Sequence, residues 1–196
     1  NIVTLLTFNP ILCTMKKILF FLLFASTAMM AQQAKFDFPL NENGQIIFSE
    51  VVSVDGKSKA DLFTNSKMFF VNTYKVTVDK LKINNDAPST TDTQYSIMNV
   101  KINGSDVKVK LYYTLTIASK EGKYKYDIKN LITKTEVSET PVEKLFDKVA
   151  VEKAAQKPKA MEVLTAYYGA INAEVENIKS NIKKEMAKTN ASSSDW

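Results

Sequence analysis

The side chains that could do chemistry in this sequence are of few types. The 196 residues include no histidine and a single cysteine, Cys13, and all 26 basic residues are lysines. Without histidine, neither a Ser-His-Asp triad nor a Cys-His pair can form, and zinc sites built on imidazole are excluded. Without arginine, there is no bidentate clamp for phosphate or carboxylate. Catalysis would have to use carboxylates, lysines, tyrosines or a hard metal ion bound by oxygen.

Among the carboxylates, Glu50 is the candidate for catalysis. It lies in segment 45–54 in register with apolar residues, so its side chain points to the face of the strand that we expect to be covered. A carboxylate there needs a partner, and we expect a lysine-paired or edge-exposed group. Asp86 and Asp92 could hold calcium, but they lack the D-x-[DN]-x-[DN]-G spacing of a known calcium loop. We therefore predict no metal site and no cofactor.

Lysines gather on one side of three predicted strands. They alternate with apolar residues and therefore point away from the buried face. We predict that they form a binding surface for an anionic polymer or an acidic protein of the envelope. No specific nucleic acid is expected, since the net charge is only +5. The alternative is a solvated face whose lysines discourage edge pairing. The predicted binding residues are Lys101, Lys108, Lys110, Tyr112, Lys123, Lys125 and Lys129.

A predicted sheet must position these residues. Segment 45–54 is rich in β-branched residues and predicts a strand. Segments 95–102 and 107–117 flank an Asn-Gly pair that is typical of a hairpin. Strict alternation in 107–117 and again in 123–132 predicts antiparallel strands with one buried face. Between the first strand and the hairpin we predict a short or bulged strand within 74–83 and a polar loop at 84–92.

Two long amphipathic helices are available to cover that face. Ser58 and Asp61 come close to a capping box and predict a helix over 59–73. After Pro158, apolar residues recur at steps of three and four from Met161 to Ile182. We expect this stripe to pack on the sheet of its own chain, and a coiled-coil dimer seam is the alternative. The predicted fold is α+β with the order β-α-β-β-β-β-α, an antiparallel sheet covered on one face by two main helices.

The beginning of the sequence predicts export. Two lysines precede an apolar run, 18–25, and small residues follow it, which is the layout of a secretory signal peptide over 15–31. The run is too short for a membrane span. Cleavage after Ala28 or after Ala31 fits the pattern, and we expect a periplasmic or secreted protein. The predicted division is mistranslated upstream sequence at 1–14, the signal at 15–31, one domain at 32–188 and a disordered tail at 189–196.

Three stretches of the sequence resemble a known family. They are FSEVVSVDGKSKADLF (48–63), VKVKLYYTLTIASKEGKYKYDIKN (107–130) and PVEKLF (141–146). The family comprises secreted proteins of Bacteroidetes-type bacteria, classed as a domain of unknown function with a TBP-like fold. Segment 75–92 is longer and more polar than the family pattern. The resemblance implies an antiparallel sheet curved under two helices, and it implies no activity, because DNA binding does not follow from topology.

These observations lead to one functional hypothesis with two alternatives. The leading hypothesis is an exported, non-catalytic binding or interaction module of the cell envelope, which we expect to be a monomer without a transmembrane segment after signal removal. The first alternative is a carboxylate-dependent hydrolase that uses Glu50. The second is a carrier of a small apolar ligand held between the sheet and the helices.

Overall fold

Strand β4 (Ser105–Lys120) organises the fold because its side chains alternate strictly between two environments. In the computed structural model of the protein, which describes residues 36–189, five alternate side chains of this strand are completely buried. The side chains between them are exposed or half-buried. The predicted alternation of this strand is therefore confirmed, and the strand is longer than 107–117 at both ends. The buried set is Val109, Leu111, Tyr113, Leu115 and Ile117.

The sheet built around β4 has six strands, and the pairings within it are antiparallel. Its order is β1-β5-β4-β3-β2, and the short β6 pairs with β5. Asn103 and Gly104 join β3 to β4 with positive φ angles of 52° and 82°, as the predicted Asn-Gly hairpin turn requires. The other strands are β1 (Ile47–Ser53), β2 (Lys82–Asn84), β3 (Ser89–Ile102), β5 (Lys123–Lys134) and β6 (Glu139–Pro141).

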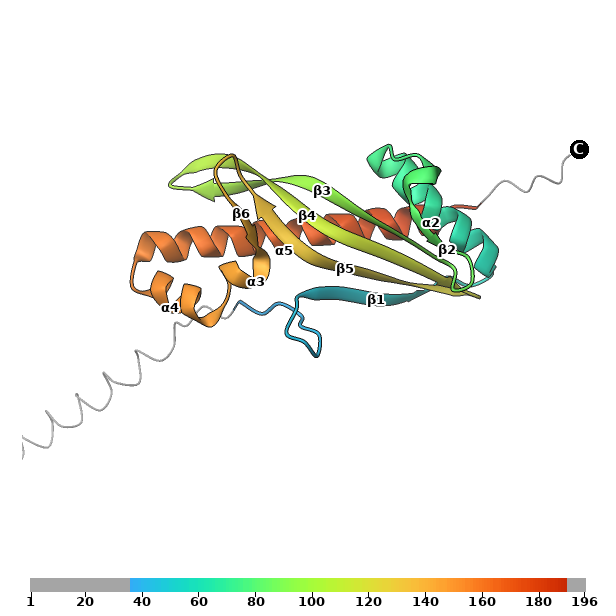
Figure 1. Ribbon diagram of the computed structural model, residues 1–196, viewed down its shortest axis with the longest axis horizontal. Coiled ribbons are helices and arrows are strands. Elements are labelled where there is room, and N and C mark those ends of the chain that lie inside the picture. The colour runs from blue at the N-terminus through green and yellow to red at the C-terminus, as the bar shows by residue number, and fades with distance from the viewer. Residues whose placement is uncertain (1–35, 190–196) are drawn as a thin grey trace, which may run out of the picture. The chain divides into compact units, whose positions relative to one another are not determined.

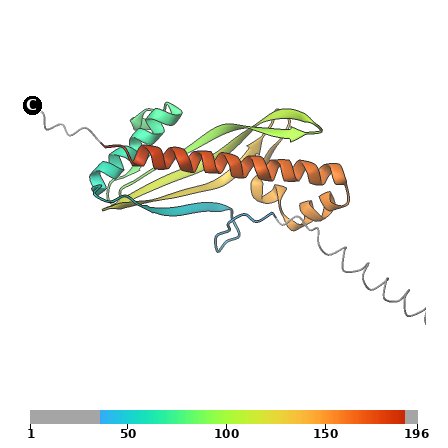
Figure 2. The same ribbon diagram turned by 180° about the vertical axis from the view of Figure 1, so that it is seen from behind.

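Two main helices, α2 (Lys59–Tyr74) and α5 (Pro158–Met186), cover one face of the sheet. In Figure 1 the sheet lies in front of α5, and the view from behind shows α5 running along it (Figure 2). Two short helices, α3 (Val142–Leu145) and α4 (Lys148–Ala155), connect β6 to α5. The predicted α+β class is confirmed. The short β6, α3 and α4 are additions to the predicted order. The segments predicted at 1–14 and 15–31 and the tail beyond 189 lie outside the described residues.

Two predicted segments between α2 and the hairpin are confirmed only in part. Within 74–83 we preferred a strand, but α2 continues to Tyr74, a 3₁₀ turn occupies Val78–Lys80 and only Lys82–Asn84 pairs as β2. The predicted loop at 84–92 is reduced to a turn at 85–88, because β3 begins at Ser89. The threonines that suggested a loop pair across two strands, where their β-branched side chains suit the pleated surface.

The two main helices are fastened to each other at the C-terminal end of α5. The buried amide of Asn65 on α2 donates to the carbonyl oxygens of Met186 at 3.2 Å and Lys188 at 2.8 Å. Asn72 donates to the Glu185 carboxylate at 2.9 Å. The last carbonyls of a helix lack partners within it, so α2 supplies hydrogen bonds that α5 cannot make for itself.

The apolar stripe of α5 packs within its own chain. Its second half is buried against the sheet, and its first half is partly buried. Tyr167, Tyr168 and Ala170 contribute partly buried positions at the middle of the helix. The predicted packing on the sheet therefore accounts for the stripe without a partner helix. The buried residues of the stripe are Ile171, Val175, Ile178 and Ile182.

We predict that Ile178→Ala lowers the free energy of unfolding by about 2–5 kcal/mol, because it leaves a cavity under the sheet. Urea unfolding of the wild type and the variant measures the difference. Lys184→Ala, on the exposed side of the same helix, should stay within about 0.5 kcal/mol of the wild type. The coiled-coil alternative would instead be supported if the wild type forms a dimer whose stability depends on protein concentration, and if Ile178→Ala abolishes that dimer.

Candidate functional site

The strand register places the predicted binding residues on the open face of the sheet, opposite α2 and α5. On β4, the partners of Lys108 and Lys110 are Asn99 and Ile97. All seven residues share the face whose side chains are not covered by the helices. On β5, Lys134 lies opposite Lys110. For the other predicted residues, the cross-strand partners are Asp106 for Lys101, Tyr95 and Ile132 for Tyr112, Lys120 and Ser53 for Lys123, Ala118 and Val51 for Lys125, and Thr114 and Ile47 for Lys129.

The open face does not bring the seven residues into one cluster. Lys110 lies near the β3–β4 hairpin, whereas Lys125 lies opposite Ala118, eight residues further along β4. At the rise of a β-strand this separation is about 27 Å. The predicted surface is thus divided into two lysine groups, one towards each end of the sheet, with Lys129 between them opposite Thr114. We call the group around Lys101, Lys108 and Lys110 the hairpin group and the group around Lys123 and Lys125 the far group.

The hairpin group surrounds a pair of tyrosines. The rings of Tyr95 and Tyr112 face each other across the β3–β4 pair with their centroids 5.3 Å apart. The Nζ atom of Lys110 lies 5.1 Å from the centroid of the Tyr95 ring, and that of Lys134 lies 6.0 Å from the Tyr112 ring. Ammonium groups at these distances are attracted by the negative face of an aromatic ring. The two rings and the two charges therefore form one connected surface.

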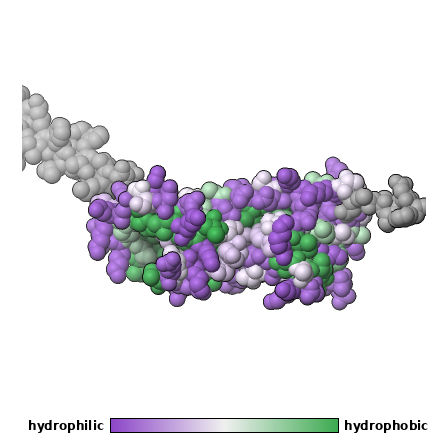
Figure 3. Space-filling model, turned by 90° about the horizontal axis from the view of Figure 1, so that it is seen from above, coloured by the Kyte–Doolittle hydropathy of each residue, from purple (hydrophilic) through white to green (hydrophobic). Residues whose placement is uncertain are grey.

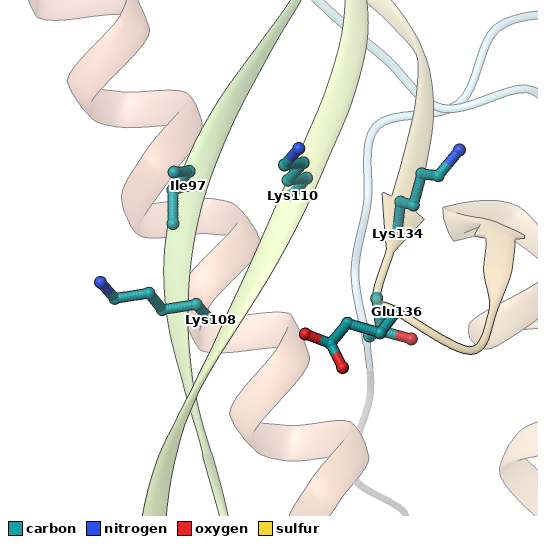
Figure 4. A pocket seen from close by; sticks show the side chains of 6 residues that line it. Ile97, Lys108, Lys110, Lys134 and Glu136 are labelled. Atoms are coloured by element: carbon teal, nitrogen blue, oxygen red, sulfur yellow. The ribbon is translucent and has the colours of Figure 1, made fainter.

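A hollow of ≈ 380 Å³ opens beside this surface (Figure 4). Lysines from two strands flank it, and the Glu136 carboxylate lies among them in Figure 4. Its lining contains both apolar and charged groups, as binding sites that combine burial with orientation do. The lining residues are Ile97, Lys108, Lys110, Lys134, Thr135 and Glu136.

Sequence analysis missed Lys134 because of a bulge in β5. Asn130 has a positive φ of 54°, and the register shifts by one residue between Tyr112 and Thr114 of β4. The extra residue changes which positions face the helices, so Leu131 is buried and Lys134 joins the open face. Asparagine tolerates a positive φ better than most residues other than glycine. Asn130 was therefore the signal in the sequence that could have indicated the bulge. Tyr95 and Ile97 were also not predicted. They alternate with the buried residues of β3 in the same way as Lys101, so the pattern that placed Lys101 on this face also applies to them.

The far group is partly neutralised. Lys125 forms an ion pair with Asp127 at 3.0 Å on the same face of β5. Within residues 36–189, no ion pair with a carboxylate involves Lys108 or Lys110. Their positive charges are therefore more available to an external anion than that of Lys125.

Glu50 lies on the covered face, at the edge of the sheet, where it is paired as predicted. It accepts hydrogen bonds from the Tyr126 hydroxyl and from Lys183 Nζ, the latter at 2.7 Å. The Lys183 hydrogen bond, followed by that of Tyr126, lowers the pKa of the Glu50 carboxyl below its ordinary value of 4.5. Burial and the same hydrogen bond raise the pKa of Tyr126. A carboxylate with a lowered pKa is a weak base, which favours the structural interpretation of Glu50.

The segment that contains Asp86 and Asp92 is arranged by its own hydrogen bonds. The Asn84 side chain accepts from the backbone N–H groups of Asp86 and Ala87, both at 3.0 Å, and so closes the turn itself. Asp92 accepts from Gln94 at 2.6 Å. Among residues 36–189, no group of three potential metal ligands occurs. None of the helices described is both long and apolar enough to cross a bilayer.

A second hollow, of ≈ 430 Å³, lies where the described chain begins. Aromatic rings line it: Phe36 and Phe38 pack edge-on against Phe146 with centroids 4.9 Å and 5.1 Å apart. The space between the sheet and the helices is itself filled by core side chains such as Phe69 and Ile171. An apolar ligand would therefore fit the aromatic hollow better than the interior that the carrier hypothesis assumed.

Comparison with known proteins confirms the family resemblance. Residues 48–134 match the model of a family described as "Domain of unknown function (DUF4468) with TBP-like fold". No curated protein matches the sequence. The match covers strands β1 to β5, which build the open face.

Two crystal structures have a similar fold. A TBP-like protein from Parabacteroides distasonis has a TM-score of 0.58 at 13% identity, covering 78% of this chain and 98% of that chain. A DUF4468 family protein from Bacteroides ovatus has a TM-score of 0.62 at 12% identity, covering 79% of this chain and 92% of that chain. Identities this low show a shared fold alone.

The Glu50 pair gives a pH-dependent prediction. Because the pKa of Glu50 is lowered in the folded protein, its contribution to stability is present above pH 4.5 and is lost as the pH falls through the lowered value. Glu50→Gln should therefore reduce the free energy of unfolding by up to about 1 kcal/mol at neutral pH, as is typical of a half-exposed pair, and by less near pH 3.

Urea unfolding at both pH values measures this difference. Glu162→Gln, an exposed glutamate on α5, serves as the control and should show no such pH dependence. A Glu50→Gln effect that is equally large at both pH values would contradict the electrostatic assignment.

Proposed function

We propose that the domain carried by this chain is an exported, non-catalytic binding module of the cell envelope whose binding surface is centred on the hairpin group. The observation that carries the proposal is the cluster of two facing tyrosines and unpaired lysines beside an open hollow. Tyrosine is enriched at binding surfaces, and lysines that have no carboxylate partner remain available to an external anion.

The chemistry of the surface favours an anionic partner. Lysine is a flexible point charge without the planar fork of arginine, so it attracts carboxylates without fixing their geometry. Each exposed charge pair contributes only about 0–1 kcal/mol. Several lysines must therefore act together on a partner that carries repeated negative charge, while Tyr95 and Tyr112 add apolar contact.

The remaining carboxylates support a non-catalytic role. Glu50 is held by Lys183 and Tyr126 on the other face of the sheet, and the hollow of the hairpin group contains one carboxylate, Glu136. Hydrolysis by carboxylates generally uses two such groups in one site, one as acid and one as base or nucleophile. The hairpin group is better suited to attraction than to proton transfer.

Charge reversal in the hairpin group tests the proposal. We predict that Lys108→Glu with Lys110→Glu weakens binding of fluorescein-labelled poly-L-glutamate and of polygalacturonate by about tenfold, because two charge pairs of up to about 1 kcal/mol each are lost. Fluorescence anisotropy measures the affinity. Wild-type binding should fall with salt, since the Debye length shortens from about 10 Å at 0.1 M to about 3 Å at 1 M.

Two double variants with the same change in net charge are the controls. Lys153→Glu with Lys159→Glu, on exposed positions of α4 and α5, should leave binding within about twofold of the wild type. Lys123→Glu with Lys125→Glu tests the far group and should have a smaller effect than the hairpin pair. Equal losses of affinity in all three variants would show that binding depends on net charge alone, which contradicts a binding surface at the hairpin group. Absence of binding by the wild type would also overturn the proposal.

Export is tested separately. When the chain is expressed in a bacterium from Met15, we expect the protein recovered from the periplasm or medium to begin at Gln32 or Met29, because a peptidase cleaves after the small residues of the signal. Intact-mass measurement identifies the first residue. Protein that stays in the cytoplasm with residues 15–31 attached would contradict the export part of the proposal and leave the binding part to its own test.

A further inference from the structure

Strand β3 has a neighbour on its outer side over only part of its length. β2 pairs with Ser89, Thr90 and Thr91, whereas β3 continues to Ile102. From residue 92 to residue 102, no other strand of the described part of the chain borders that side. A long unpaired edge exposes a row of backbone donors and acceptors, and another chain can pair with them.

The register shows which backbone groups point outwards. In a two-residue hairpin, the residues that flank the turn, here Ile102 and Ser105, form a hydrogen-bonded pair. Pairs then alternate, so even-numbered residues of β3 bond to β4 and odd-numbered residues direct their N–H and C=O groups to the other side. The Ser119 N–H of β4 donates to the carbonyl oxygen of Pro88, an even-numbered residue next to β3, at 2.8 Å, in agreement with this parity.

One outward group is already occupied. The Asp92 side chain accepts a hydrogen bond from the Thr93 N–H at 2.8 Å and so caps the edge next to β2. Beyond it, the outward positions are Tyr95, Ile97, Asn99 and Lys101. β1, at the opposite edge, offers a shorter run, since the Ile47 N–H donates to the Pro39 carbonyl at 3.0 Å.

The four outward residues also carry their side chains on the open face. Tyr95 and Ile97 are 47% and 55% exposed. Lys108 extends from β4 across β3 towards this edge (Figure 4). Beneath them, Met98 and Val100 are buried on the side that α5 covers. The free edge of β3 therefore has buried core residues on one face and apolar and cationic side chains on the open face.

Seen from the side on which β3 and α2 lie, the surface has two separate hydrophobic areas with hydrophilic side chains between them (Figure 3). A broad apolar partner is therefore a poor match for this side. A narrow partner that uses backbone hydrogen bonds suits it better.

We propose that the free edge of β3, from Tyr95 to Lys101, binds an extended acidic segment of another protein by strand addition. The inference rests on the proposed function and specifies its partner. Main-chain hydrogen bonds would supply affinity, as in other strand-addition complexes, and the lysines of the hairpin group would select acidic side chains. A second copy of this chain is a worse occupant, because it would bring further lysines of the same charge to this edge, whereas an acidic segment brings the opposite charge.

Asn99→Pro and Asn99→Ala form a matched pair for the test. Both remove the side chain, but only proline removes the outward N–H and adds a ring at the edge. Proline is tolerated at edge positions whose N–H faces solvent, so the ladder to β4 stays intact. The probe is a short labelled peptide of alternating threonine and glutamate, and polygalacturonate is the anion without a peptide backbone.

We expect Asn99→Pro to weaken peptide binding by about tenfold or more and Asn99→Ala by less than about twofold, since only proline loses a backbone hydrogen bond and blocks approach. Neither variant should change binding of polygalacturonate. If proline and alanine bind the peptide alike while Lys108→Glu with Lys110→Glu still weakens it, strand addition is overturned and the proposed function stands. If the lysine variant has no effect either, both fail.

Amide hydrogen exchange of the wild type gives a measurement that does not depend on a proline variant folding. Added peptide should slow exchange of the Tyr95, Ile97 and Asn99 N–H groups by about tenfold or more, because strand pairing occupies them. Unchanged exchange at saturating peptide would overturn the proposal. Protection of the same groups without peptide, together with a dimer, would overturn it in favour of a second copy.

Discussion

The burial of one face of β4 is the constraint on which the rest of the structure depends. Every second side chain from Val109 to Ile117 is fully buried, and apolar surface of this extent must be removed from water, at about 25 cal/mol per Å². The helices α2 and α5 meet that requirement from one side only. The lysines of β3, β4 and β5, together with Tyr95 and Tyr112, share the other side because a strand has only two faces.

Sequence patterns could predict what depends on alternation and could not predict what depends on distant contacts. The parity of β4 was sufficient to place Lys108 and Lys110 correctly. Parity along β5 does not place Lys134, because the bulge at Asn130 changes which positions of β5 point to the open face. The length of β3 was underestimated because threonine-rich segments resemble loops until a pairing partner is known. The hydrogen bonds of Asn65 to the end of α5 join residues more than a hundred positions apart, and no local pattern indicates them.

The distribution of ion pairs distinguishes lysines that stabilise the fold from lysines that remain available. Lys183 is paired with Glu50 on the covered side, and Lys125 and Lys134 have carboxylate neighbours at 3.0 Å and 2.7 Å. Among the described residues, Lys108 and Lys110 form no ion pair, and the Lys110 Nζ lies over the Tyr95 ring instead. A composition with twenty-six lysines conceals this difference, which appears only when each side chain is assigned its neighbours.

The position of α5 at the end of the domain has a kinetic consequence. The β3–β4 and β4–β5 hairpins join neighbouring segments, and local pairings of this kind form quickly. By contrast, β1 must find β5 about eighty residues away, and the cover provided by α5 exists only once the chain extends to Met186. We therefore expect the sheet to assemble around β4 before its apolar face is sealed, so that closure of α5 over the hairpins is the late step of folding.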